Sequence, residues 1–140
     1  MLVQFTRDKI KDCINCYKEI YPDENWKDDE IQYNLECVLK NNHSVGILAY
    51  EDGKCVGFVI GNVFYMERDR YASLDEIGVI KEWQNKKVGT MLLKEFECQC
   101  KALGAYAVCL EHFNFEKLNH FYTSHGYFIP DDRIVRNKII

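Results

Sequence analysis

The stretch that decides the fold runs from residue 74 to residue 93 and reads Leu74-Asp75-Glu76-Ile77-Gly78-Val79-Ile80-Lys81-Glu82-Trp83-Gln84-Asn85-Lys86-Lys87-Val88-Gly89-Thr90-Met91-Leu92-Leu93. Its first part is largely apolar and ends in aliphatic residues, which predicts a buried strand over residues 73–80. A polar loop follows. Apolar residues then recur at helical spacing, which predicts a helix over residues 88–103. The stretch is therefore a strand, a loop and a helix in succession.

The first turn of this helix has the properties of an anion site. The N–H groups of Val88, Gly89 and Thr90 have no acceptor within the helix, and the helix dipole adds partial positive charge there. Gly89 permits close approach of a phosphate to the backbone, and Lys86 and Lys87 add charge beside it. A purely structural connection between strand and helix explains these residues almost equally well.

The rest of the chain supplies the other elements of a mixed fold. Gly53 marks a hairpin turn, Pro22 ends a helix, and Gly104 and Gly126 end two others. We expect helices over residues 8–21, 27–40 and 115–125, a polar loop over 66–72, and strands over 2–6, 45–50, 55–65, 105–111 and 134–140.

This order predicts an α+β fold with three layers. The strand–helix–strand unit implies a right-handed crossover between parallel strands, and the other strands read as antiparallel. We expect a central mixed, mostly antiparallel sheet of six to seven strands, covered by about four helices. No repeat or linker divides the chain, so residues 1–140 are expected to form a single domain.

Composition and charge exclude some functions. The 140 residues include 18 basic and 22 acidic side chains, for a formal charge of −4. That balance argues against nucleic acid as a partner, because such a surface needs clustered Lys and Arg. No apolar run approaches the roughly 20 residues that cross a bilayer, so no membrane association is expected. A homodimer is left open.

The seven cysteines favour free thiols in a reducing compartment. The first residues lack the basic and apolar regions of a signal peptide, so a cytoplasmic protein is expected. Cys13-x-x-Cys16 has no second ligand pair at zinc spacing and falls in a helical pattern, which favours small buried thiols. No metal is expected.

Two motifs together resemble the GNAT superfamily of acyl-CoA-dependent N-acyltransferases. Its signature is a strand ending Leu/Ile-x-Val, followed by Arg/Gln-x-x-Gly-x-Gly/Ala at the start of a helix. Here it reads Ile77-x-Val79 and then Gln84-Asn85-Lys86-Lys87-Val88-Gly89, with Lys87 in place of the first glycine. The second motif, Phe121-Tyr122-Thr123-Ser124-His125-Gly126-Tyr127-Phe128, is similar to the family's Phe-Tyr-x-x-x-Gly-Phe segment. Phe115 stands where an asparagine is frequent.

The resemblance implies acetyl-CoA as co-substrate. The backbone of Ile77, Gly78 and Val79 would pair with the pantetheine arm as an added strand would. The loop from Gln84 through Asn85, Lys86 and Lys87 to Val88, Gly89 and Thr90 would hold the pyrophosphate. Asn114 is expected to cap the last helix, and it is also a candidate contact of the coenzyme.

The resemblance also implies a catalytic base and a catalytic acid. Attack on the thioester needs a neutral amine, so Asp75 or Glu76 would accept a proton, directly or through water. Glu76 is preferred because it alternates with Ile77 and Val79, which are expected to face the packed side. Tyr122 would protonate the departing thiolate. Alternatively, both carboxylates are structural, and Tyr122 belongs to an apolar helix stripe with Leu118, Phe121 and His125.

The acidic region from Glu19 to Glu36 lies where the family places its variable acceptor lid. Carboxylates and an indole occur together in Tyr21-Pro22-Asp23-Glu24-Asn25-Trp26, which suits a small cationic amine such as a polyamine or an aminoglycoside. A solvated helix face is the alternative. The function expected is acetyl transfer to a primary amine. The competing functions are a catalytically silent acyl-CoA sensor and a protein-interaction domain without coenzyme.

Overall fold

The computed structural model describes all residues from Met1 to Ile140. It contains two compact units, residues 1–110 and residues 111–140. The first unit holds the sheet and three α-helices, and the second holds the last helix and the C-terminal segment. None of the helices has both the length and the apolar content that crossing a membrane requires.

The first unit is built on a sheet of five strands. Their spatial order is β1-β2-β3-β4-β5, with β1 to β4 antiparallel and β5 parallel to β4. The mixed, mostly antiparallel sheet is therefore confirmed, but it has five strands rather than six or seven. The elements of this unit are β1 Leu2–Gln4, η1 Arg7–Lys9, α1 Ile10–Ile20, α2 Asp28–Lys40, β2 Ser44–Glu51, β3 Lys54–Met66, β4 Asp69–Val79, η2 Lys81–Trp83, α3 Val88–Ala102 and β5 Ala107–Cys109.

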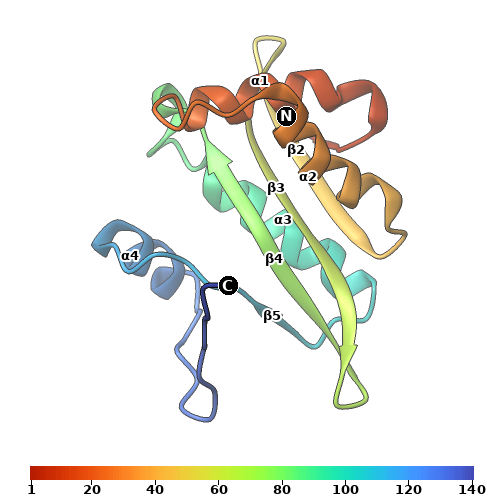
Figure 1. Ribbon diagram of the computed structural model, residues 1–140, viewed down its shortest axis with the longest axis vertical. Coiled ribbons are helices and arrows are strands. Elements are labelled where there is room, and N and C mark those ends of the chain that lie inside the picture. Colours follow the sequence, from red (N-terminus) through yellow and green to blue (C-terminus); the bar gives the residue numbers. More distant parts are fainter. The chain divides into compact units, whose positions relative to one another are not determined.

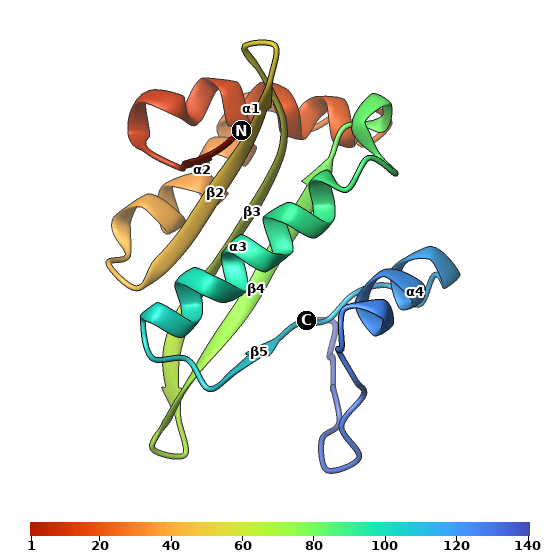
Figure 2. The same cartoon turned by 180° about the vertical axis from the view of Figure 1, so that it is seen from behind.

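Helices cover both faces of this sheet. Figures 1 and 2 show α1 and α2 on one face and α3 on the other. The central strand β3 is buried over most of its length because helices pack on both of its sides. Phe58 from β3 and Phe96 from α3 are fully buried in this core. The three-layer arrangement predicted from the sequence is confirmed.

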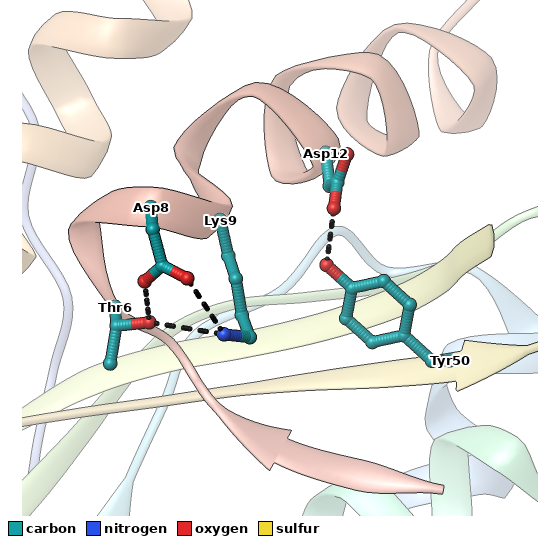
Figure 3. Close-up of polar contacts among 5 residues, drawn as sticks. All are labelled: Thr6, Asp8, Lys9, Asp12 and Tyr50. Atoms are coloured by element: carbon teal, nitrogen blue, oxygen red, sulfur yellow. Dashed lines mark hydrogen bonds and ion pairs between the residues drawn. The ribbon is translucent and has the colours of Figure 1, made fainter. Parts of the chain in front are cut away.

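Contacts at the start of α1 tie this helix to the sheet, as Figure 3 shows. The Tyr50 hydroxyl on β2 donates a hydrogen bond to the Asp12 carboxylate at 2.7 Å. Thr6 donates to Asp8 at 2.5 Å, and the Lys9 ammonium group lies 3.1 Å from the same carboxylate. The Tyr50–Asp12 bond links α1 to β2, whereas the contacts among Thr6, Asp8 and Lys9 order the turn that leads into the helix.

A β-bulge interrupts β4 at the two acidic residues. Ile60 of β3 pairs with Glu76 and Gly61 pairs with Leu74, so Asp75 has no Cα partner on β3. A Cβ atom at Gly61 would lie 2.1 Å from the Ser73 carbonyl oxygen, so only glycine fits opposite the bulge. Bulges change the direction of a strand and of its side chains. This one lies where the sequence places its candidate bases.

The outer edge of β4 is paired over only part of its length. β5 pairs with Tyr71, Ala72 and Ser73, and no strand pairs with this edge from residue 74 to residue 79. The backbone there keeps the hydrogen-bonding capacity that a further strand would use. A strand-like ligand can therefore pair along this edge.

The expected polar loop over residues 66–72 is instead a tight hairpin. β3 runs to Met66 and β4 begins at Asp69, with Glu67 and Arg68 at positive φ in the turn. Arg70 donates hydrogen bonds to the Tyr65 hydroxyl and to the Leu103 carbonyl oxygen, both at 2.8 Å. The residues are polar because this end of the hairpin is exposed, not because it lacks strand structure.

Two strand predictions at the C-terminal end need correction. The strand expected over residues 105–111 is only β5, and it lies at the sheet edge rather than at its centre. Residues 134–140 have no regular secondary structure and are exposed. Their apolar, β-branched composition fits a strand, but a strand needs a partner and no strand of the sheet pairs with this segment.

Candidate active site

The loop between β4 and α3 is shaped as the anion-site prediction requires. The first backbone hydrogen bond of α3 runs from the Met91 N–H to the Lys87 carbonyl oxygen at 3.0 Å, so the amides of Val88 and Gly89 lie ahead of it. No side chain caps this helix, and its first turn contains no acidic residue. Helix N-termini of this kind attract anions. Its donors and charge fit a diphosphate.

Lys87 occupies the N-cap position of α3 with φ of 68°, in the left-handed region. This conformation explains why the family usually has glycine there, since a side chain costs about 1–2 kcal/mol in it. Asn85 also has positive φ, a conformation that asparagine tolerates better than most residues. The loop therefore holds two residues other than glycine at positive φ, Asn85 and Lys87.

Replacing Lys87 by glycine is expected to raise the free energy of unfolding by about 0.5–1 kcal/mol. The relief of left-handed strain exceeds the added entropy of the unfolded chain, which is about 0.4–1 kcal/mol. Urea unfolding of the two proteins measures the difference. Lys86→Gly is the matched control, because Lys86 has no positive φ and its replacement should destabilise. Equal losses in both variants would contradict this account of Lys87.

The side chain of Gln84 fastens the loop to the end of β4. Its Nε2 donates a hydrogen bond to the Val79 carbonyl oxygen at 3.0 Å. Lys86 places its ammonium group 4.8 Å from the ring centroid of Trp83, a cation–π contact within the same loop. The residues predicted to hold the coenzyme from Ile77 to Thr90 thus form the end of β4, a loop fastened to it and the start of α3.

The two acidic residues of β4 have different surroundings. Asp75 is exposed and accepts a hydrogen bond from the Ser73 hydroxyl at 2.8 Å. Glu76 is half-buried on the α1 side of the strand. Burial raises the pKa of the Glu76 carboxyl above its usual range, and the phenols of Tyr21 and Tyr17 act in the opposite direction.

The faces of β4 agree with the expected alternation. A Cβ atom at Gly78 would lie 2.8 Å from Ile20 Cδ1, which places Gly78 and α1 in close contact. Val79 lies on the other side, near Leu92 of α3, since both approach the space that a Cβ at Gly57 would fill. Ile77 is half-buried and alternates with Gly78. Glu76 thus faces the opposite way from the residues that pack under α3.

Tyr17, which the sequence analysis missed, forms an aromatic cluster with Tyr21 and Trp26, two residues that it had placed in the acceptor region. The ring of Tyr17 lies 5.0 Å from that of Tyr21 and 5.5 Å from that of Trp26, centroid to centroid. The Trp26 Nε1 donates to the Glu24 carboxylate at 2.5 Å. The only signal was the spacing of the two tyrosines by four residues, which reads as an ordinary buried helix face.

A recess of about 260 Å³ opens next to this cluster. It brings together an indole, a phenol and the chain that follows α1, so its walls mix aromatic and polar side chains, and Glu24 is held beside it by the Trp26 indole. Its lining residues are Lys18, Tyr21, Pro22, Asn25 and Trp26. The region that the sequence marked as an acceptor lid is therefore hollowed.

Tyr122 is buried within the second unit, on helix α4, which spans Glu116–Ser124. Its ring stacks on that of His112 at 4.8 Å and meets that of Tyr127 edge-on at 5.7 Å. Burial raises the pKa of the phenol, so the hydroxyl is protonated at neutral pH. Its burial is typical of a core residue, and its protonated hydroxyl is what a general acid requires. Both interpretations of Tyr122 therefore remain compatible with the structure.

The capping role expected for Asn114 is wrong. The N-cap of α4 is Phe115, and no side chain caps that helix. The Asn114 Oδ1 instead accepts a hydrogen bond from Asn119 Nδ2 at 2.8 Å. The helix begins one residue later than the asparagine pattern predicts. The Asn114 side chain therefore contacts a side chain of α4 and not the backbone N–H groups of its first turn.

The cysteines of α1 are confirmed as buried free thiols. Cys13 and Cys16 are both buried, and so is Cys55 of β3, whose Sγ donates to the Gly57 carbonyl oxygen at 3.5 Å. Burial raises the pKa of the Cys13 thiol. No three His, Cys, Asp or Glu side chains are grouped so that they would hold a metal ion.

The open edge of β4 and the uncapped start of α3 lie along one stretch of chain. The sequence matches the acetyltransferase (GNAT) family over residues 10–127. The chain therefore belongs to this family, and the resemblance noted in the sequence is confirmed. No curated protein sequence matches it.

Solved structures share the fold across almost the whole chain. An aminoglycoside antibiotic 6′-N-acetyltransferase from Acinetobacter haemolyticus has a TM-score of 0.81 at 15% identity, with 100% of this chain and 99% of that chain covered. An integron cassette protein of V. cholerae has a TM-score of 0.83 at 14% identity, covering 99% and 91%. An aminoglycoside N-acetyltransferase in complex with CoA has a TM-score of 0.81 at 15% identity, covering 99% and 93%.

Proposed function

We propose that the protein transfers the acetyl group of acetyl-CoA to a primary amine of a small cationic molecule, with residues 1–140 acting as one domain. The family match supports this extent, because it runs through both compact units. The observation that carries the proposal is the continuity of the open β4 edge, the Gln84–Thr90 loop and Glu76 along one stretch of chain.

The coenzyme is proposed to bind along this stretch through the backbone. The edge from Ile77 to Val79 would pair with the pantetheine amides, and the amides at the start of α3 would hold the diphosphate. Lys86 and Lys87 would add positive charge. The lack of a capping side chain and of acidic residues in the first turn of α3 supports this fit. Asn114 is a further candidate for contact with the coenzyme.

Glu76 is proposed as the base in preference to Asp75. It would take a proton from the acceptor ammonium, directly or through water, so that the nitrogen lone pair attacks the thioester carbonyl carbon. A C–N bond forms and the C–S bond breaks. The new amide nitrogen gives up its second proton to solvent, and the leaving thiolate takes a proton from Tyr122, which is then reprotonated from solvent. The raised pKa of Glu76 supports this choice, because a base works best when its pKa lies nearer the working pH.

Replacing Tyr122 by phenylalanine is expected to lower kcat by about 10- to 100-fold while KM for acetyl-CoA stays nearly constant. The substitution keeps the ring and removes only the proton that would reach the thiolate. Steady-state kinetics with free-thiol detection measure both constants, and thermal unfolding monitors the fold. An unchanged kcat in a folded variant would show that Tyr122 is a packing residue.

The acceptor is proposed to be a small polycation such as a polyamine or an aminoglycoside. The carboxylates and aromatic rings around residues 21–26 would bind it through charge and cation–π contacts. The test is an amine panel incubated with acetyl-CoA, followed by free-thiol release. Turnover with polyamines or aminoglycosides supports the proposal. Turnover of neutral amino sugars alone would contradict it, and binding without any thiol release would favour a sensor.

A further inference from the structure

Three aromatic side chains of the second unit pack against the ring of Tyr122. The His112 imidazole stacks on it, with ring centroids 4.8 Å apart and planes inclined by 21°. Phe121 and Tyr127 pack edge-on, at 5.1 Å and 5.7 Å. Stacked and edge-to-face arrangements are those that aromatic rings prefer. The phenol proposed as the acid is therefore covered on one face by a histidine that the reaction does not otherwise use.

The imidazole of His112 is itself fixed in orientation. Its Nδ1 lies 2.7 Å from the Phe113 carbonyl oxygen. Because a carbonyl oxygen can only accept, Nδ1 carries the proton and donates it. His112 is exposed, whereas Tyr122 is buried. Removal of the imidazole therefore leaves a gap at the surface and not in the core, so variants of His112 are expected to fold.

The segment that carries His112 is fastened to α4. The Asn114 Oδ1 accepts a hydrogen bond from Asn119 Nδ2 at 2.8 Å, and the Phe115 carbonyl oxygen accepts one from the Asn119 N–H at 2.9 Å. Asn119 and Tyr122 are three residues apart on this helix, so they lie on the same face. The two hydrogen bonds thus hold the segment on the face of α4 from which Tyr122 projects.

The end of α4 supplies a second support for the phenol ring. Gly126 has φ of 86°, and the Tyr127 N–H donates a hydrogen bond to the Tyr122 carbonyl oxygen at 3.1 Å. A glycine in this conformation ends a helix and turns the chain back. The turn brings the Tyr127 ring against that of Tyr122. The phenol is therefore supported from the chain before α4 and from the chain after it.

We propose that His112 is a positioning residue whose stacked imidazole holds the phenol of Tyr122 in the orientation that delivers its proton to the thiolate. This inference rests on the proposed function. Proton transfer requires the donor to lie within hydrogen-bonding reach of the acceptor, and a small misplacement lowers the rate. A ring packed on the face of the phenol opposes its rotation out of that orientation. The role requires an aromatic ring at residue 112 and no proton from it.

The kinetic test compares His112→Ala, His112→Phe and His120→Ala. His120 is an exposed histidine of α4, so its replacement is the matched control. In His112→Ala, kcat is expected to fall about tenfold, with KM for acetyl-CoA unchanged. In His112→Phe, whose phenyl ring can stack, kcat should recover to within about twofold of wild type. Thermal unfolding checks that each variant is folded. A phenylalanine variant as slow as the alanine variant would overturn the proposal.

A double-mutant cycle tests whether His112 acts through the Tyr122 hydroxyl. Once Tyr122→Phe has removed the hydroxyl, adding His112→Ala is expected to lower kcat no further, because coupled residues give non-additive losses. The same tenfold loss in both backgrounds, about as large as the loss from His112→Ala alone, would mean that His112 acts elsewhere, and it would overturn the positioning role.

A second measurement does not depend on activity. In protein with ¹³C-labelled tyrosine rings, the Tyr122 signal is assigned from its disappearance in Tyr122→Phe, and ¹³C relaxation reports the mobility of that ring. The mobility should rise in His112→Ala and stay at the wild-type level in His112→Phe and His120→Ala. Unchanged mobility in His112→Ala overturns the proposal. If the mobility rises but Tyr122→Phe keeps full kcat, His112 does hold the ring, and the acid role of Tyr122 in the proposed function is what fails.

Discussion

Replacing Glu76 by glutamine is expected to lower kcat/KM for acetyl transfer by about 10²- to 10⁴-fold, the contribution typical of a general base. Glutamine has nearly the same shape as glutamate and its amide oxygen can still accept hydrogen bonds, so the fold should persist. Affinity for acetyl-CoA should hardly change, because the proposed coenzyme contacts lie on the backbone of residues further along the chain. Steady-state kinetics and calorimetric titration measure the two effects.

The pH dependence of the same variant gives an independent check. In the wild-type protein, kcat/KM should fall as the pH drops through the pKa of Glu76, because the protonated carboxyl accepts no proton. That pKa is raised by burial, so the fall should begin at higher pH than for an exposed glutamate. The residual activity of Glu76→Gln should lack this limb. If the acid limb persists in Glu76→Gln, it belongs to the titration of another group.

Asp75→Asn separates the two candidate bases. Asp75 is exposed and its carboxylate is engaged with the Ser73 hydroxyl, so we expect less than about a tenfold loss of kcat/KM. If instead Asp75→Asn were slower than Glu76→Gln, Asp75 would be the base.

Replacing Gly89 by aspartate is expected to weaken acetyl-CoA binding by about 100-fold or more and yet to stabilise the protein. A carboxylate in the first turn of α3 would occupy the diphosphate site and repel the diphosphate. The helix amides and the helix dipole would then stabilise the carboxylate instead. The same charge, with the loss of a helical glycine, should raise the free energy of unfolding by about 0.5–1 kcal/mol.

The opposite signs of these two effects make the Gly89 variant informative. Damage to the fold would lower both quantities, whereas a blocked anion site lowers only the affinity. Cys98→Asp is the matched control, since it places the same charge on an exposed position of the same helix. It should leave the affinity unchanged. Similar affinities for Gly89→Asp and wild type would remove the start of α3 from the coenzyme site.

Local sequence signals predicted the strand–loop–helix stretch well. Apolar spacing placed α3 to within one residue, and the turn at Asp52 and Gly53 follows from the positive φ that both residues adopt. The motif also located Lys87 as the departure from the family pattern. The backbone of Lys87 is in the left-handed region, which explains why glycine is usual at this position. A lysine there adds conformational strain to the loop.

The remaining features depend on partners far away in sequence. Whether residues 134–140 form a strand depends on a partner strand, which local composition does not supply. Tyr17 and Tyr21 read as helix core because their spacing says nothing about the carboxylate on β4 whose pKa their phenols lower. The bulge at Asp75 likewise arises from the pairing of β4 with Gly61, so the orientation of the two acids could not be read from alternation alone.

The central claim is that backbone donors along β4 and at the start of α3 bind an acyl-CoA. Isothermal titration of the full chain with acetyl-CoA tests it most directly, together with thermal unfolding in the presence of the ligand. We predict saturable one-site binding and a stabilisation of about 2.7 kcal/mol at a hundredfold excess over Kd. Absence of both heat and stabilisation with acetyl-CoA and with longer acyl-CoA thioesters would contradict the claim.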